Sequence, residues 1–182
     1  MIAEQKKIAI FDLDGTLVDT DAANSAAYSV ALARVGVRNM FGLVGRVTAD
    51  VVRAAMGDGT SVVLDDIVKM KVEAYCGELW RACLGSASEA FRCVLVSRSM
   101  FDKVVLLSDG SERRVMETLN HFGWKNLFDE IVCNGGRGDK YANYFGDFDS
   151  DPAACVVWEN EKGQIMSAIA AGVKMENIRK VG

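Results

Sequence analysis

The chain has 182 residues and a mass of 19.8 kDa, which suits one domain or one core with a smaller insertion. Half of its residues are hydrophobic and 25% are charged, as in a globular protein that can bury a core. With 21 basic and 25 acidic residues the formal charge is −4, which gives no general attraction for nucleic acid or an anionic membrane. No apolar run approaches the roughly 20 residues of a membrane span, and no secretion signal is evident.

The cysteines and the single histidine narrow the possible chemistry. Five cysteines occur without a Cys-x-x-Cys pair, which is typical of reduced, packed thiols, so we expect a cytoplasmic protein. His121 is the one histidine, which excludes a zinc site of the usual spacing, and the sequence has no Gly-x-Ser-x-Gly motif. Carboxylates, a lysine and hydroxyl groups are therefore the side chains expected to carry any reaction.

The first predicted element is a strand over residues 7–11, an apolar run that ends at two aspartates. A helical block follows, from about residue 21 to residue 99. Small and apolar residues at helical spacing predict helices over 22–35, 48–56 and 61–80, with Asp21 and Thr48 as N-caps. This block is expected to be an insertion between the first and second strands of a sheet.

Three aromatic residues of the helical block, Tyr75, Trp80 and Phe91, could line a substrate site. Burial in a small core of the insertion itself is the simpler interpretation, because isolated aromatic residues at helical spacing usually pack.

The second half of the chain alternates between strands and helices. Apolar runs predict strands over 104–107, 130–133 and 155–158, and helical patterns over 112–122 and 163–171 follow the first and third of these. Each strand ends in polar or glycine-rich residues. Strand, polar turn, helix and strand in this order predict an α/β fold with a parallel sheet.

The most informative stretch is Asp12-Leu13-Asp14-Gly15-Thr16, directly after the first predicted strand. Two carboxylates two residues apart are placed at the carboxyl end of a sheet, where α/β proteins bind ligands. One carboxylate can attack an electrophile while the other transfers protons, and Gly15 allows a tight backbone turn. An isolated Asp-x-Asp is often only a solvated turn, but the whole pattern with flanking apolar residues favours a catalytic site.

With this motif the chain resembles the haloacid dehalogenase-like hydrolase superfamily. The resemblance covers residues 7–18 and about 102–182. It implies a Rossmann-like parallel sheet core, here residues 1–20 and 100–182, with an α-helical cap inserted at residues 21–99. It also implies Mg²⁺-dependent phosphatase chemistry through an aspartyl-phosphate. Dehalogenases of the superfamily typically replace the second aspartate, so Asp14 argues against that activity.

The resemblance assigns expected roles to five residues. Asp12 matches the nucleophile and a magnesium ligand, and Asp14 the general acid/base whose backbone carbonyl also faces the metal. Ser108 matches the hydroxyl that binds the phosphoryl group, with Asp109 beside it. Lys140 matches the third-motif lysine, although Tyr141 follows it where many members have proline, and Arg137 is a rival cation three residues earlier.

The fourth motif departs from the pattern of the superfamily, which usually ends this strand with two acidic residues. Here the matching pair is Glu159 and Asn160, both expected as magnesium ligands, with Glu161 next. An asparagine can bind Mg²⁺ through its carbonyl oxygen but adds no charge. We therefore expect weaker metal binding than two carboxylates would give, unless Glu159 or Glu161 compensates.

The resemblance leads to an expected function and two alternatives. We expect a magnesium-dependent phosphatase that hydrolyses a small phosphomonoester, without nucleic-acid or membrane partners. A phosphomutase would use the same residues and return the phosphoryl group to its substrate. A degenerate member that only binds a phosphorylated ligand is the non-enzymatic alternative, favoured by Asn160 and by the missing proline after Lys140.

Overall fold

The computed structural model describes residues 7–37, 47–56, 61–77, 84–147 and 150–182. The chain divides into two compact units. We call Met1–Val18 with Ala87–Gly182 the core unit, and Asp19–Ser86 the inserted unit.

The core unit is built on a five-stranded parallel sheet with the strand order β3-β2-β1-β4-β5. The strands span Ile8–Phe11, Lys103–Ser108, Glu130–Cys133, Cys155–Glu159 and Ile178–Lys180, from β1 to β5. The central strand β1 is buried along its whole length, because it pairs with β2 on one side and β4 on the other. The predicted α/β fold and parallel sheet are confirmed, and β5 is an additional strand whose three residues carry no readable pattern.

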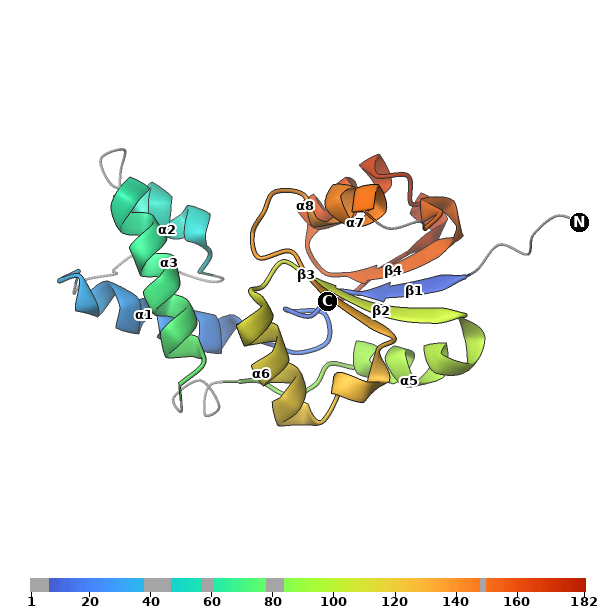
Figure 1. Ribbon diagram of the computed structural model, residues 1–182, viewed down its shortest axis with the longest axis horizontal. Coiled ribbons are helices and arrows are strands. Elements are labelled where there is room, and N and C mark those ends of the chain that lie inside the picture. The colour runs from blue at the N-terminus through green and yellow to red at the C-terminus, as the bar shows by residue number, and fades with distance from the viewer. Residues whose placement is uncertain (1–6, 38–46, 57–60, 78–83, 148–149) are drawn as a thin grey trace, which may run out of the picture. The chain divides into compact units, whose positions relative to one another are not determined.

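Helices cover both faces of this sheet (Figure 1): α7 and α8 lie on one face, and α5 and α6 on the other. They span Ala90–Met100 (α5), Glu112–Phe122 (α6), Lys140–Asp147 (α7) and Lys162–Ala170 (α8). Tyr141 and Tyr144 of α7 pack in one buried cluster with Ile10, Val105 and Val157 of the three central strands. The helix α6 ends, as predicted, at Gly123, whose φ of 70° is a left-handed conformation that glycine adopts without strain.

The inserted unit contains the helices α1 (Asp21–Arg34), α2 (Ala49–Met56) and α3 (Ser61–Tyr75). Its main buried cluster joins α1 to α3 through Tyr28, Leu32 and Ile67. Thr48 caps α2 as predicted, since its Oγ1 accepts a hydrogen bond from the Val51 N–H at 3.3 Å. The prediction that Asp21 caps α1 is wrong: Asp21 is the first helical residue, and Thr20 occupies the cap position. No helix in the described ranges is long and apolar enough to cross a membrane.

The boundary after the insertion differs from the expected residue 99, because the inserted unit ends at Ser86. The helix α5 belongs to the core unit, where Phe91 stacks on Trp124 with ring centroids 4.0 Å apart. The expectation that Phe91 packs within the insertion is therefore wrong. Tyr75 is fully buried in the inserted unit beside Ala23 and Ala27, as expected. Trp80 lies outside the described residues.

The two connections that join the units run side by side as an antiparallel stem. Val18 and Ala87 form an isolated antiparallel bridge, and the Ser88 N–H donates to the Leu17 carbonyl at 2.8 Å. The Gly85 N–H donates to the Asp19 carbonyl at 2.9 Å. A Cβ at position 85 would lie 2.7 Å from the Asp19 Cβ, so this close approach requires glycine.

Candidate active site

Asp12 lies at the carboxyl end of β1, where the backbone leaves the sheet. Its N–H still bonds the Trp158 carbonyl of β4 at 3.1 Å, which fixes the residue against the neighbouring strand. The residue is buried, and its Oδ1 accepts a hydrogen bond from Lys140 Nζ at 2.7 Å. This bond leaves Oδ2 of Asp12 with no protein donor among the described residues.

Lys140, the first residue of α7, also reaches Glu159 at the end of β4. Its Nζ lies 2.8 Å from Glu159 Oε2, which also accepts the Tyr141 hydroxyl at 3.0 Å. The other oxygen, Oε1, accepts the backbone N–H groups of Asn160 at 3.0 Å and Glu161 at 3.1 Å. Four donors therefore hold the Glu159 carboxylate, and this carboxylate in turn orients Lys140 toward Asp12.

Burial dominates the electrostatics of this cluster. Burial raises the pKa of Asp12 to about 7; Lys140 opposes the rise, while Glu159 and Asp14 add to it. Burial lowers the pKa of Lys140, but the carboxylates of Asp12 and Glu159 outweigh it and raise the pKa above its ordinary value. Lys140 is therefore a fixed ammonium group, buried to 2% exposure beside the proposed nucleophile.

Asp14 is paired with Arg114, a residue that the sequence analysis does not single out. Arg114 Nη1 lies 2.5 Å from Asp14 Oδ1, and Nη2 bonds Oδ2, so the pair is bidentate. Both residues are buried. The arginine belongs to the amphipathic pattern of α6, and nothing in the local sequence marks its role.

The loop after β2 carries Ser108, Asp109 and Gly110 at the carboxyl end of that strand. Ser108 is fully buried, and its Oγ accepts the Gly110 N–H at 3.1 Å. The Asp109 carboxylate accepts the Asn134 Nδ2 amide at 2.6 Å, so its side chain fixes the loop against the end of β3. Asn134 is a second residue that the sequence analysis missed. Backbone N–H groups at the N-terminus of α6 favour an anion here.

Asn160 packs against the turn of the first motif. Its Oδ1 accepts the Thr16 hydroxyl at 3.2 Å. A Cβ on Gly15 would lie 2.2 Å from Asn160 Nδ2, and Gly15 has a φ of 80°, so both contact and conformation require glycine there. The fourth motif thus lies directly against the first.

The oxygen atoms near Asp12 form a sparse set of possible cation ligands. No three histidine, cysteine, aspartate or glutamate side chains of the described residues gather into a metal-binding group. The donors are the free oxygen of Asp12, the backbone carbonyl of Asp14 and Asn160 Oδ1. Mg²⁺ often binds through one or two carboxylates, completed by water and substrate phosphate, so this donor set fits a magnesium ion of that kind.

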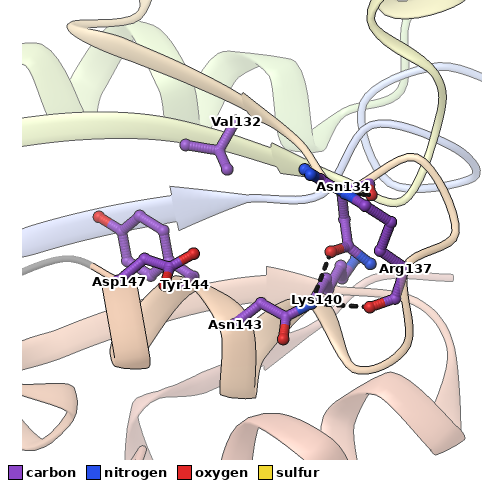
Figure 2. A pocket seen from close by; sticks show the side chains of 7 residues that line it. All are labelled: Val132, Asn134, Arg137, Lys140, Asn143, Tyr144 and Asp147. Carbon is purple, nitrogen blue, oxygen red and sulfur yellow. Dashed lines mark hydrogen bonds between the residues drawn. The ribbon is translucent and has the colours of Figure 1, made fainter.

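A pocket of about 260 Å³ opens beside Lys140, on the side toward β3 (Figure 2). The side chain of Asn143 forms part of the pocket wall. Its Nδ2 donates hydrogen bonds to Asn134 Oδ1 at 2.9 Å and to the Arg137 carbonyl at 2.8 Å. Arg137, the alternative to Lys140 in the third motif, donates through Nε to the Asn134 carbonyl at 2.8 Å. It therefore stabilises the loop after β3, and Lys140 is the cation that contacts Asp12. The lining residues are Val132, Asn134, Arg137, Lys140, Asn143, Tyr144 and Asp147.

The structure thus gathers the predicted residues at one edge of the sheet. Lys140 and Glu159 are joined to Asp12, Asn160 lies against the turn that carries Asp14, and Ser108 and Asp109 end the neighbouring strand β2. Arg114, Tyr141 and Asn134 complete the site.

Comparisons with known proteins give likenesses in sequence and in fold. The chain is 27% identical to fructose-1-phosphate phosphatase YqaB of Escherichia coli over 184 residues, which covers 93% of the chain and 95% of that protein. CbbY from Rhodobacter sphaeroides, solved with phosphate, has a TM-score of 0.71 at 18% identity, covering 93% of this chain and 84% of that one. A subfamily IA hydrolase from Geobacter sulfurreducens has a TM-score of 0.60 at 18% identity, with 92% and 84% covered.

No protein-family model matches the sequence. The structural likenesses establish the fold, and the relative from E. coli extends the likeness to the sequence over nearly the whole chain. The chain therefore has the fold of the haloacid dehalogenase-like hydrolases, and the Asp12–Thr16 motif that resembles theirs lies at the end of β1.

Proposed function

We propose that the protein is a phosphatase that hydrolyses small phosphomonoesters through a phosphorylated Asp12. The observation that carries the proposal is the buried pair of Asp12 and Lys140 at the carboxyl end of β1, with a polar loop ready to bind an anion at the end of β2. The identity with a fructose-1-phosphate phosphatase supports it.

In the first step an oxygen of Asp12 attacks phosphorus, and the bond from phosphorus to the ester oxygen breaks. Asp14 gives its proton to the leaving alkoxide. Ser108 and the N–H groups after it bind the phosphoryl oxygens, and Lys140 offsets the negative charge on Asp12 and the transferring group. In the second step Asp14 takes a proton from water, which attacks phosphorus and releases inorganic phosphate and the Asp12 carboxylate.

The proposal includes a magnesium requirement. Asp12, the Asp14 backbone carbonyl and Asn160 Oδ1 would hold the ion, and a bound Mg²⁺ would neutralise charge on the phosphoryl oxygens. Glu159 acts in this arrangement mainly by orienting Lys140 and the backbone of residues 160 and 161, because its two oxygens already accept four hydrogen bonds.

A small phosphorylated sugar is the substrate class that we propose. The relative from E. coli is named for fructose 1-phosphate, and a mutant of CbbY has been crystallised with xylulose-(1,5)bisphosphate. We further propose that the inserted unit is the cap that selects among such substrates, since it enters the chain directly after the Asp12 motif.

Hydrolysis of p-nitrophenyl phosphate and of a panel of sugar phosphates, with Mg²⁺ and with excess chelator, tests the proposal. We expect activity that needs Mg²⁺ and is abolished in Asp12→Asn, with an added phosphoryl group on the Asp12 peptide after rapid quenching. Asp102→Asn is the matched control, because Asp102 is an aspartate of the core unit at the opposite end of the sheet, bonded to the Lys7 N–H.

Three outcomes would contradict the proposal. Full turnover in Asp12→Asn would exclude Asp12 as the nucleophile. Transfer of the phosphoryl group back to the sugar, without release of inorganic phosphate, would indicate a phosphomutase. Binding of phosphate by a wild-type protein that hydrolyses nothing would indicate a non-catalytic member of the superfamily.

A further inference from the structure

We propose that Arg114 is a positioning residue of the reaction, which fixes the orientation of the Asp14 carboxylate from within the core unit. This inference rests on the proposed function, in which Asp14 transfers the protons. Arg114 Nη1 and Nη2 each bond a different oxygen of Asp14, so the planar guanidinium sets both the place and the rotation of the carboxylate.

The path of the arginine side chain shows that the local structure is built for this pair. Arg114 lies in the first turns of α6 and extends back over Gly110 to reach Asp14. A Cβ on Gly110 would lie 2.2 Å from Arg114 Nη2 and 2.9 Å from Cζ. The guanidinium therefore requires a glycine, without a Cβ, at position 110. The Thr118 hydroxyl donates a hydrogen bond to the backbone carbonyl of Arg114 at 3.0 Å.

The burial of the pair favours a functional role over a purely structural one. The side chains of Arg114 and Asp14 are 6% and 9% exposed. Buried ion pairs are weak contributors to stability, because removal of two charges from water offsets most of their attraction. The pair also leaves room for chemistry, since a carboxylate has about four lone-pair positions and the guanidinium uses one on each oxygen. As an ionised carboxylate held by Arg114, Asp14 is suited to take a proton from water in the second step.

The pair also makes the placement of Asp14 a property of the core unit. Asp14 and Arg114 both belong to that unit, as do Asp12 and Lys140. Both guanidinium hydrogen bonds to the acid/base therefore come from a residue of the core unit. The inserted unit remains free to select the substrate.

The test is a double-mutant cycle on the full-length protein with p-nitrophenyl phosphate in saturating Mg²⁺. We expect Arg114→Gln to lower kcat by about 10- to 100-fold with little change in KM, since misplacing a catalytic group by about 1 Å can cost on the order of 100-fold. We expect no further loss when Arg114→Gln is added to Asp14→Asn. The kcat of Arg114→Lys should lie between those of the wild type and Arg114→Gln, because lysine keeps the charge and loses the second hydrogen bond.

The phosphoenzyme gives a signature that a structural role would not produce. The nitrophenolate leaves without much protonation, so the second step depends most on Asp14. Rapid-quench mass spectrometry should show phosphorylated Asp12 accumulating in Arg114→Gln. Arg113→Gln is the control, because Arg113 is the exposed neighbour on the same helix. Its kcat and phosphoenzyme level should equal those of the wild type.

Gly110→Ala serves as the second variant if Arg114→Gln does not fold. It leaves both charges in place and crowds the guanidinium most closely, with Val115 Cγ2 the next contact at 3.0 Å, so it should also lower kcat. An unchanged kcat in folded Arg114→Gln or in Gly110→Ala would overturn the inference. A raised KM, or a loss that multiplies with that of Asp14→Asn, would show that Arg114 binds the substrate directly and would also overturn it.

The same experiment separates this inference from the proposed function. A wild-type protein that forms no phosphoenzyme and hydrolyses no phosphate ester would contradict both. A wild-type protein that turns over, with Arg114 variants that match it, would contradict only the role of Arg114.

Discussion

Tyr141 stands directly after the motif lysine, where many members of the superfamily have proline. A proline there has no hydroxyl group, whereas the buried Tyr141 donates to Glu159 Oε2 at 3.0 Å. The same oxygen accepts Lys140 Nζ. The departure from the pattern therefore adds a donor to the network that orients the lysine, and it gives no reason to regard the site as degenerate.

Asn160 is the departure with the clearest consequence for metal binding. Asn160→Asp places a carboxylate beside the Thr16 hydroxyl and the Asp14 turn, where Asn160 now offers an amide oxygen. Two unit charges at 4 Å interact by about 4 kcal/mol at an effective dielectric of 20, and part of that attraction should lower the half-saturating Mg²⁺ concentration by about tenfold or more.

Calorimetric titration with Mg²⁺, alongside metal-dependent hydrolysis of p-nitrophenyl phosphate, measures this change. Asn120→Asp on the exposed face of α6 adds the same charge away from the site and should leave the titration unchanged. If Asn160→Asp has no effect, the ion binds elsewhere, and Glu161 becomes the next candidate ligand.

The sequence was sufficient for those site residues whose position follows from strand order. Asp12, Ser108 and Glu159 are predictable because each lies at the carboxyl end of a recognisable strand. Arg114 was not predictable in the same way, because it lies within a helix and reaches the site only through a long side chain that crosses Gly110. Local patterns give the place of a residue on an element but not the reach of its side chain.

At the scale of elements, α7 was not predicted because it is short. Tyr141, Tyr144 and Phe145 recur at helical spacing in Lys140–Asp147, but eight residues fall short of the window of about 11–18 over which that spacing identifies a helix. The segment of α5 was assigned to the helical insertion without a helix being predicted over it, since nothing local shows that Phe91 stacks on Trp124, far along the chain.

The position of α5 on the core unit also depends on Asp129, at the start of β3. Its Oδ1 lies 2.6 Å from Arg98 Nη1 of α5, and its Oδ2 accepts the Val104 N–H of β2 at 2.8 Å. The hydrogen bond from Arg98 is the largest cause that lowers the pKa of Asp129, and the Val104 N–H adds to it. One carboxylate thus joins a helix and two strands.

This lowered pKa makes the contribution of Asp129 dependent on pH. A carboxyl group whose pKa is lower in the folded state stabilises the protein fully above its unfolded pKa of about 4, and the stabilisation is lost as the pH falls through the folded value. Asp129→Asn should therefore lower the free energy of unfolding at pH 7, by no more than about 1 kcal/mol because the pair is partly exposed. The difference from wild type should shrink near pH 3.

Urea denaturation at the two pH values checks this prediction. Asp66→Asn is the control, since Asp66 is exposed and lies 3.9 Å from Lys69 within one helix. It should change stability little at either pH. A destabilisation by Asp129→Asn that is equal at both pH values would contradict the argument from charge.

At the scale of the whole molecule, the paired connections predict that the core unit can fold without the inserted unit. Val18 and Ala87 already lie side by side in an antiparallel bridge, so a turn of about four residues can replace residues 19–86. We expect this shortened protein to keep the circular dichroism of an α/β fold and to unfold in one cooperative transition.

Removal of residues 21–99, the insertion as the sequence alone delimits it, is the matched control. That deletion also removes α5, together with the stack of Phe91 on Trp124. It should yield a protein without cooperative unfolding. If both deletions fold equally well, α5 is not a part of the core.

The antiparallel stem also determines how the length of the insertion affects the sheet. The entropy of closing a loop rises only with the logarithm of its length, so a doubling adds about 0.6 kcal/mol. The ends of the insertion are held together by their own hydrogen bonds. The entropic cost of closing the chain between β1 and α5 is therefore nearly the same for a short turn as for a whole helical unit. Residues 19–86 can therefore lengthen, shorten or diverge over evolution while Asp12 and Lys140 keep their places.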